Sequence, residues 1–237
     1  MYQGLGTLDT AYAEGSAYGP RPGKATVGHR KAKEAMNPHG VAIGYVHGEY
    51  VHARFMTGVI DEMKRDDALV IEEFSEPYID KARNVVVDKF LASDREWLLS
   101  VDTDIILPAC VVTRLVSRGL PLVGCLIYVN QTPKFPQIYH QIADVSYGDA
   151  GIFRVQDKFE PGELVEADGT GAGCLLIHRD VFEAIPGKPP FRWFQHEMIG
   201  NEMFGEDFTF CRRARAAGFQ LYIDTAVHAG HIKPHVI

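Results

Sequence analysis

The sequence lacks several features that would place the protein in particular classes. No apolar run approaches the ~20 residues that a bilayer-spanning helix needs, and the N-terminus has no apolar signal core. The four cysteines stand far apart without a Cys-x-x-Cys pair, which is typical of reduced thiols in an intracellular protein. The formal net charge is -7 at pH 7, and no basic stripe is present to neutralise nucleic-acid phosphates. We therefore expect a soluble, cytoplasmic protein that neither spans a membrane nor binds nucleic acid.

The chain is long and apolar enough for one complete α/β domain. It has 237 residues, 46% of them hydrophobic, and α/β folds of this length commonly form a single domain. Residues 1–40 are rich in Gly, Ala, Tyr, Pro and Lys and show neither helical nor strand periodicity, which predicts an irregular N-terminal arm. The folded domain is therefore expected at 41–237.

Periodicity then predicts alternating strands and helices. The expected strands are 41–46, 68–72, 97–107, 122–129, 174–177 and 219–224, and the expected helices cover 55–63, 78–91, 109–117, 179–185 and 205–218. The β-α-β opening predicts ligand binding beyond the carboxyl ends of the strands. Prolines and a glycine interrupt 130–156, which predicts a hairpin excursion from the sheet.

The apolar stretch at 97–107 contains two carboxylates, Asp102 and Asp104. If the stretch is one buried strand, alternation places both on the same side, a few ångströms apart. Two ionised groups that close repel unless a cation lies between them, and hard divalent metals prefer oxygen ligands. The pair therefore indicates a metal site. The alternative is that the strand ends at Val101 and the aspartates cap a helix that begins near Pro108.

Further polar residues follow in the C-terminal half. Glu206 and Asp207 begin a helix that ends in arginines and a glycine, so they serve either catalysis or the helix dipole. His228 and His231 have a spacing that allows metal binding, although no local partner fixes it. Trp193 lies in an expected loop, where an exposed aromatic suits a sugar face or an acceptor peptide and lid packing is the alternative.

Two other segments are candidates for ligand contact. Three glycines alternate in the turn at 169–173, where the backbone could approach a ligand closely, and a tight turn without a ligand is the alternative. Arg83, near the start of the expected helix, could reach a phosphate or a base. A solvated salt bridge is the alternative for this arginine.

Taken in order, these motifs resemble GT-A glycosyltransferases, the nucleotide-diphospho-sugar transferase type, and in particular family-2-like enzymes of bacteriophages and bacteria. The resemblance covers 41–231 and is carried by 82–84, 97–104, 169–183 and 205–231. It implies a single Rossmann-like domain with a central mixed, mostly parallel sheet flanked by helices. It also implies transfer of a sugar, with UDP-hexose as the expected donor, to a hydroxyl acceptor with inversion. A protein is one candidate acceptor, and the host cytoplasm is the expected location of a phage-encoded enzyme.

The resemblance also implies a ligand set for a metal. Asp104 would bind Mn²⁺ or Mg²⁺ directly, and Asp102 would contact the ribose or a metal-bound water. His231 would be the third protein ligand, with His228 as the fallback, and an imidazole ligand favours Mn²⁺.

The remaining implied roles belong to catalysis and to the two substrates. Asp207 would be the general base, with Glu206 as the less favoured candidate. The implied substrate contacts are His47, Glu49 and Arg83 around the nucleotide, Gly171, Ala172 and Gly173 along the donor sugar, and Trp193 beside the acceptor. The family more often has a hydroxyl or a small residue where His47 stands, so base recognition stays open.

Two other classes of protein remain open. A sugar-1-phosphate nucleotidyltransferase would share the nucleotide-binding half, but it should carry a glycine-rich phosphate loop with Arg and Lys after the first strand. Residues 47–50 instead read His-Gly-Glu-Tyr. A non-catalytic sugar-binding or structural module would keep the fold without turnover, and the joint presence of Asp102, Asp104, Asp207 and His231 argues against it.

Overall fold

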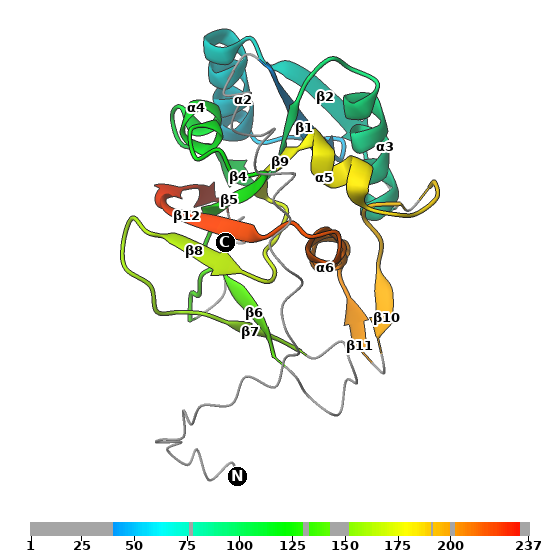
Figure 1. Cartoon of the computed structure of the whole chain (residues 1–237). Coiled ribbons are helices and arrows are strands. Elements are labelled where there is room, and N and C mark those ends of the chain that lie inside the picture. The colour runs from blue at the N-terminus through cyan, green and yellow to red at the C-terminus, as the bar shows by residue number, and fades with distance from the viewer. Residues whose placement is uncertain are drawn as a thin grey trace, which may run out of the picture.

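The computed structural model describes residues 40–75, 78–129, 133–142, 152–190, 192–199 and 202–232 (Figure 1). The expected N-terminal arm, apart from Gly40, lies outside the described residues. The helices are α2 (Ala53–Asp66), α3 (Ile79–Leu91), α4 (Val111–Val116), α5 (Arg179–Ala184) and α6 (Glu206–Ala216). The strands are β1 (Val41–His47), β2 (Leu69–Phe74), β3 (Trp97–Asp102), β4 (Ile105–Ile106), β5 (Leu122–Leu126), β6 (Tyr139–Ile142), β7 (Ile152–Val155), β8 (Leu164–Ala167), β9 (Cys174–His178), β10 (Glu197–Ile199), β11 (Glu202–Phe204), β12 (Leu221–His228) and β13 (Gly230–His231).

A seven-stranded mixed sheet forms the centre of the molecule, in the order β2-β1-β3-β9-β5-β12-β8. Strands β2, β1, β3, β5 and β12 run in one direction, because β9 is antiparallel to both β3 and β5, and β8 is antiparallel to β12. The sheet is therefore mostly parallel, as the sequence predicts. The parallel strands end at the same edge, where ligands of such sheets bind.

Two hydrophobic cores cover the two faces of this sheet. Helices α3, α5 and α6 contribute to one core and helices α2 and α4 to the other. Strand β3 shows how alternation divides its residues between them: Leu98 belongs to the first core, and Leu99 and Val101 to the second. By the same alternation, Ser100 and Asp102 face the side of α3 and α6.

A glycine in β1 lets α3 approach the sheet closely. A Cβ atom on Gly44 would lie 2.5 Å from Cγ1 of Val86 in α3 and 2.8 Å from Cδ1 of Leu98 in β3. Real Cβ atoms do not make such short contacts, so this close approach requires glycine. It brings the N-terminal half of α3, which carries Arg83, close to the carboxyl end of β3.

The structure confirms most predicted elements and changes others. The excursion is a hairpin of β6 and β7, which pair antiparallel, although 130–132 and 143–151 lie outside the described residues. The hairpin of β10 and β11 was not predicted. The single strand at 97–107 is wrong: β3 ends at Asp102, a turn follows, and β4 pairs antiparallel with β13. None of the described helices combines the length and the apolar character that a bilayer span needs.

Candidate active site

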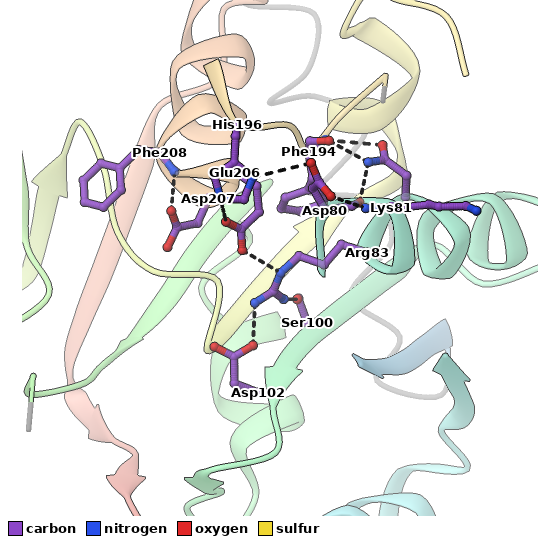
Figure 2. Close-up of polar contacts among 11 residues, drawn as sticks. Asp80, Lys81, Arg83, Ser100, Asp102, Phe194, His196, Glu206, Asp207 and Phe208 are labelled. Atoms are coloured by element: carbon purple, nitrogen blue, oxygen red, sulfur yellow. Dashed lines mark hydrogen bonds and ion pairs between the residues drawn. The ribbon is translucent and has the colours of Figure 1, made fainter. Parts of the chain in front are cut away.

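A buried arginine connects the carboxylates at the carboxyl edge of the sheet. Arg83, only 5% exposed, donates from Nη2 to Oδ1 of Asp102 at 2.6 Å and from Nε to Oε1 of Glu206 at 3.2 Å. A longer contact of 3.5 Å joins its Nη1 to Oγ of Ser100 (Figure 2). Helix α3, strand β3 and helix α6 therefore meet at one guanidinium group, and the prediction of a solvated salt bridge for Arg83 is wrong.

The charges around Arg83 compensate one another. Burial alone would lower the pKa of Arg83, but the nearby carboxylates of Asp102 and Glu206 raise it further above its ordinary value, so the guanidinium stays charged. A buried arginine needs such partners, because an unpaired buried charge is strongly destabilising. Arg83 thus holds two of the candidate carboxylates in fixed orientations.

The ionic chain continues on the other side of Glu206. Nε2 of His196 lies 3.5 Å from Oε2 of Glu206, and Nδ1 of the same ring lies 3.4 Å from Oδ2 of Asp80 (Figure 2). Sequence reasoning missed both His196 and Asp80. Asp80 is in the first turn of α3, three residues before Arg83. This i,i+3 spacing is the local signal that could have drawn attention to Asp80.

Among the described residues, Glu206 forms ion pairs with Arg83 and His196, whereas Asp207 forms none. Its Oδ1 accepts the backbone N–H of Phe208 at 2.7 Å, and Figure 2 shows its carboxylate between Glu206 and Phe208. Burial, and then the negative charge of Glu206, raise the pKa of Asp207 to about 6, against the opposing influence of Arg83. A carboxylate with a pKa near neutrality is suited to accept a proton.

The two aspartates of the Asp-x-Asp motif do not share one face of a strand. Asp102 ends β3 and binds Arg83, whereas Asp104 lies in the turn that follows, with its side chain 55% exposed. The prediction of a same-side pair is wrong, because the chain turns after Asp102 to pair β4 with β13. The alternative is wrong as well, since neither aspartate caps α4.

The same turn brings Asp104 to a histidine that is distant in sequence. Nε2 of His231 lies 3.1 Å from Oδ2 of Asp104, and the backbone N–H of Ile232 donates to the carbonyl of Asp104 at 2.7 Å. Nδ1 of His231 lies 3.1 Å from the carbonyl oxygen of Tyr128. Because a carbonyl can only accept, Nδ1 would donate to it, and Nε2, which faces the Asp104 carboxylate, is the nitrogen that could bind a metal in place of that contact.

The donor set fits a divalent cation only in part. Asp104 and His231 supply one oxygen and one nitrogen close together, but in the part of the chain that the structure describes no three His, Cys, Asp or Glu residues are grouped to hold a metal ion. His228 is exposed, and its Nε2 contacts the carbonyl oxygen of Thr225 at 2.8 Å. A metal at this edge would therefore need further ligands from a bound substrate or from water.

The glycine-rich turn at 169–173 lies against Asp102. The carbonyl of Gly173 accepts the backbone N–H of Asp102 at 3.0 Å, and a Cβ on Gly173 would lie 3.3 Å from Oδ2 of Asp102. A Cβ on Gly171 would lie 2.7 Å from the side-chain oxygen of Gln137. Ala172 between them is 1% exposed and belongs to the core.

The aromatic loop is not exposed. Trp193 and Phe194 are each 2% exposed, and the indole N–H of Trp193 donates to the carbonyl of Phe182 at 2.8 Å. Asn84 holds this loop: its Oδ1 accepts the backbone N–H of Trp193 at 2.9 Å, and its Nδ2 donates to the carbonyl of Phe194. The expectation of an exposed Trp193 is therefore wrong, and its alternative of ordinary packing holds.

His47, the last residue of β1, and Glu49 lie at the same edge of the sheet. Nε2 of His47 lies 3.4 Å from Oε2 of Glu72, its Nδ1 lies 2.7 Å from the carbonyl oxygen of Gly48, and its ring packs edge-to-face with Phe74. Glu49 is exposed. The structure places both residues at the carboxyl end of β1 and does not test a contact with a nucleotide.

Comparisons with known proteins identify the fold. No protein-family model matches the sequence, and a search of curated proteins finds no relative. The crystal structure of A197 from STIV is similar, with a TM-score of 0.58 and 18% identity over 82% of this chain and 86% of that one. The structure of GalNAc-T7 with UDP, GalNAc and Mn²⁺ is similar over 81% of this chain, with a TM-score of 0.53 and 14% identity.

The chain spans 44% of the length of GalNAc-T7. A glycosyltransferase involved in glycosylation of the major capsid of PBCV-1 is matched with 12% identity over 60% of this chain and 62% of that one, and the TM-score of 0.34 is too low to carry an argument. At these identities the likeness concerns the fold alone. The chain therefore has a GT-A-like fold, as its motifs predict.

Proposed function

We propose that the protein is a nucleotide-sugar glycosyltransferase that needs a divalent metal. The proposal is carried by two groups of residues at the carboxyl edge of a GT-A-like sheet: Asp102 and Asp207 around Arg83, and Asp104 against His231. The expected donor is a UDP-hexose. This choice is supported by the GT-A-like fold and by the UDP, GalNAc and Mn²⁺ in the structure of GalNAc-T7. Inversion, a cytoplasmic location and a protein acceptor stay predictions.

The leaving group of such a transfer is a nucleoside diphosphate, whose charge must be stabilised as the bond to the sugar breaks. Asp104 and His231 would hold Mn²⁺ or Mg²⁺, because Nε2 of His231 is the nitrogen left for a metal and Oδ2 of Asp104 faces it. The ion would supply positive charge at the diphosphate. Asp102, oriented by Arg83, has its second oxygen against the glycine-rich turn, where we place the ribose and the donor sugar.

Proton removal from the acceptor is assigned to Asp207. Because its pKa is raised to about 6, Asp207 binds a proton more tightly than an ordinary carboxylate does. Near neutrality it can therefore take the proton of the attacking hydroxyl. Glu206 is already bound by Arg83 and His196, which leaves it a positioning role. A positioned general base typically contributes ~10² to 10⁴-fold to the rate.

The test is a comparison of nucleotide-sugar binding and hydrolysis with and without Mn²⁺. In the wild type we expect UDP-hexoses to raise the melting temperature only when Mn²⁺ is present, since ligand binding stabilises the folded state. Asp104→Ala and His231→Ala should abolish this shift, whereas the nearby control His228→Ala should retain it. Asp207→Asn should retain binding and lose transfer.

Each competing class predicts another outcome. A nucleotidyltransferase would release pyrophosphate from a nucleoside triphosphate and a sugar phosphate, and a binding module would show the thermal shift without any hydrolysis or transfer. Equal loss of nucleotide binding in the Asp104 and Asp207 variants would contradict the roles assigned to these two residues.

A further inference from the structure

A cluster of half-buried aromatic rings lies beside Asp207 and has no role in the site described so far. Phe208 packs edge-to-face with Tyr139 of β6 at a centroid distance of 4.9 Å and is tilted against Phe153 of β7 at 4.7 Å. Phe153 also contacts Phe204 of β11 at 5.8 Å. Two hairpins and the start of α6 thus bring these rings together, and all four residues are partly exposed.

Gly169 leaves space for the rings, and backbone hydrogen bonds hold Tyr139 beside it. A Cβ on Gly169 would lie 2.9 Å from ring atoms of both Phe153 and Phe208, so only glycine lets the two rings close over the turn. The backbone N–H of Tyr139 donates to the carbonyl of Gly169 at 3.1 Å, and the carbonyl of Tyr139 accepts the N–H of Asp168 at 2.8 Å. Tyr139 is therefore held against the glycine-rich turn by backbone hydrogen bonds.

Ionic contacts also hold strand β6 at Gln141. Oδ2 of Asp168 accepts the backbone N–H of Gln141 at 2.8 Å, and Nη2 of Arg215 lies 2.9 Å from Oδ1 of Asp168. Nη1 of Arg215 donates to the side-chain oxygen of Gln141 at 3.0 Å. Such a rigid support is what a binding surface needs, because a surface already in its bound arrangement loses less freedom on binding.

The rings adjoin the group that would remove the acceptor proton. Phe208 follows Asp207 directly and donates its backbone N–H to that carboxylate. Burial, and then the negative charge of Asp207, raise the pKa of Tyr139, which places the phenol within electrostatic reach of the base. A molecule lying on the rings would therefore present its hydroxyl groups to Asp207.

We propose that Tyr139, Phe153 and Phe208 form the acceptor subsite of the proposed transferase and bind the apolar face of a sugar ring. A pyranose has one face of C–H groups, which suits an aromatic surface, and a rim of hydroxyls, which suits the carboxylate and phenol at its border. Arg83 and Arg215 are paired with carboxylates, and the negative charge of Asp207 acts on Tyr139, so an uncharged polyol fits better than an anionic acceptor.

An extended peptide is the weaker occupant. Peptides that bind along a strand use the free hydrogen-bonding edge of a sheet. At Tyr139 both edges are taken, by Val155 of β7 on one side and by Gly169 on the other. A protein acceptor would therefore be recognised through a sugar that it already carries. This inference rests on the proposed function, and it names the chemical class of the acceptor.

The experiment uses the full chain, a UDP-hexose donor with Mn²⁺, and a panel of methyl hexosides as acceptors beside sugar-free serine and threonine peptides. Tyr139→Leu should raise the KM for the accepted hexoside about tenfold, the loss expected for an aromatic contact of about 1.4 kcal/mol. Tyr222→Leu is the matched control, because Tyr222 is a half-buried tyrosine of β12 that contacts Glu166 rather than Asp207. Tyr139→Phe should retain most of the affinity if ring contact is the main contribution.

Saturation-transfer NMR with the same hexosides and no donor gives an independent readout of the subsite. Binding by the wild type that is weakened in Tyr139→Leu and not in Tyr222→Leu supports the inference, even if no UDP-hexose proves to be a donor and the proposed function fails. An unchanged KM and unchanged saturation transfer in Tyr139→Leu would overturn it. Transfer to sugar-free peptides and to no hexoside would also overturn it, while leaving the proposed function intact.

Discussion

Replacing Asp207 with asparagine is expected to stabilise the fold while removing transfer. Burial, and then the charge of Glu206, raise the pKa of Asp207 from its ordinary 3.8 to about 6. One pKa unit corresponds to about 1.4 kcal/mol, so ionised Asp207 lowers the free energy of unfolding by about 3 kcal/mol. Asparagine has nearly the same size, carries no charge and keeps an oxygen for the N–H of Phe208.

The size of this effect depends on pH in a defined direction. Between its two pKa values Asp207 binds a proton more tightly in the folded chain than in the unfolded one, so its contribution to stability falls as the pH rises through this window. Asparagine does not titrate, so the stability of the variant does not fall in this pH window for the same reason. Its gain over the wild type should be about 3 kcal/mol near pH 8 and roughly half as much near pH 5.

Urea unfolding at these two pH values measures both free energies. Asp168→Asn is the control of opposite sign: burial would raise the pKa of Asp168, but the hydrogen bond from His140 and the charge of Arg215 outweigh burial and lower it. Ionised Asp168 therefore stabilises the fold above its unfolded pKa, and its asparagine variant should be less stable at both pH values. If Asp207→Asn were no more stable than the wild type near pH 8, the argument from burial would be refuted.

Two further substitutions test the support of the site. Arg83→Met keeps the apolar stem but leaves Asp102 and Glu206 without their cation, so urea unfolding should show a loss of about 3 to 5 kcal/mol, and an unchanged stability would contradict the buried ion pairs. Gly44→Ala should lower the free energy of unfolding by about 1 to 3 kcal/mol, because the new methyl group would overlap Val86. Adding Val86→Ala should recover part of this loss. If it recovers none, the overlap with Val86 is not the cause of the loss.

Elements with a strong local pattern could be predicted from the sequence. The strand expected at 41–46 is Val41–His47, and the helix expected at 205–218 is Glu206–Ala216, because hydrophobic periodicity and the acidic start and glycine stop of α6 are local signals. The same holds for the hairpin excursion. The fold class followed from the order of these elements, and the comparisons with solved structures support it.

What the sequence could not reveal depends on contacts between distant residues. Strand β3 ends early because β4 pairs with β13, and the resulting contact between Asp104 and His231 joins residues 127 positions apart. Trp193 is buried because Asn84, 109 positions before it, binds its backbone. Neither partner has a local signature, since an asparagine in a helix and a histidine after a strand are common in any sequence.

The roles of the three carboxylates around Arg83 follow from how one buried cation can be shared. The guanidinium group has two well-directed contacts with carboxylates, and Asp102 and Glu206 occupy them at 2.6 and 3.2 Å. In the part of the chain that the structure describes, Asp207 accepts a hydrogen bond from the backbone N–H of Phe208, and burial and the charge of Glu206 raise its pKa. The arrangement that orients Asp102 thus also leaves Asp207 with a raised pKa, which suits it to accept a proton. Replacing Glu206 with glutamine should therefore lower the pKa of Asp207, and the acidic limb of the transfer rate should move to lower pH.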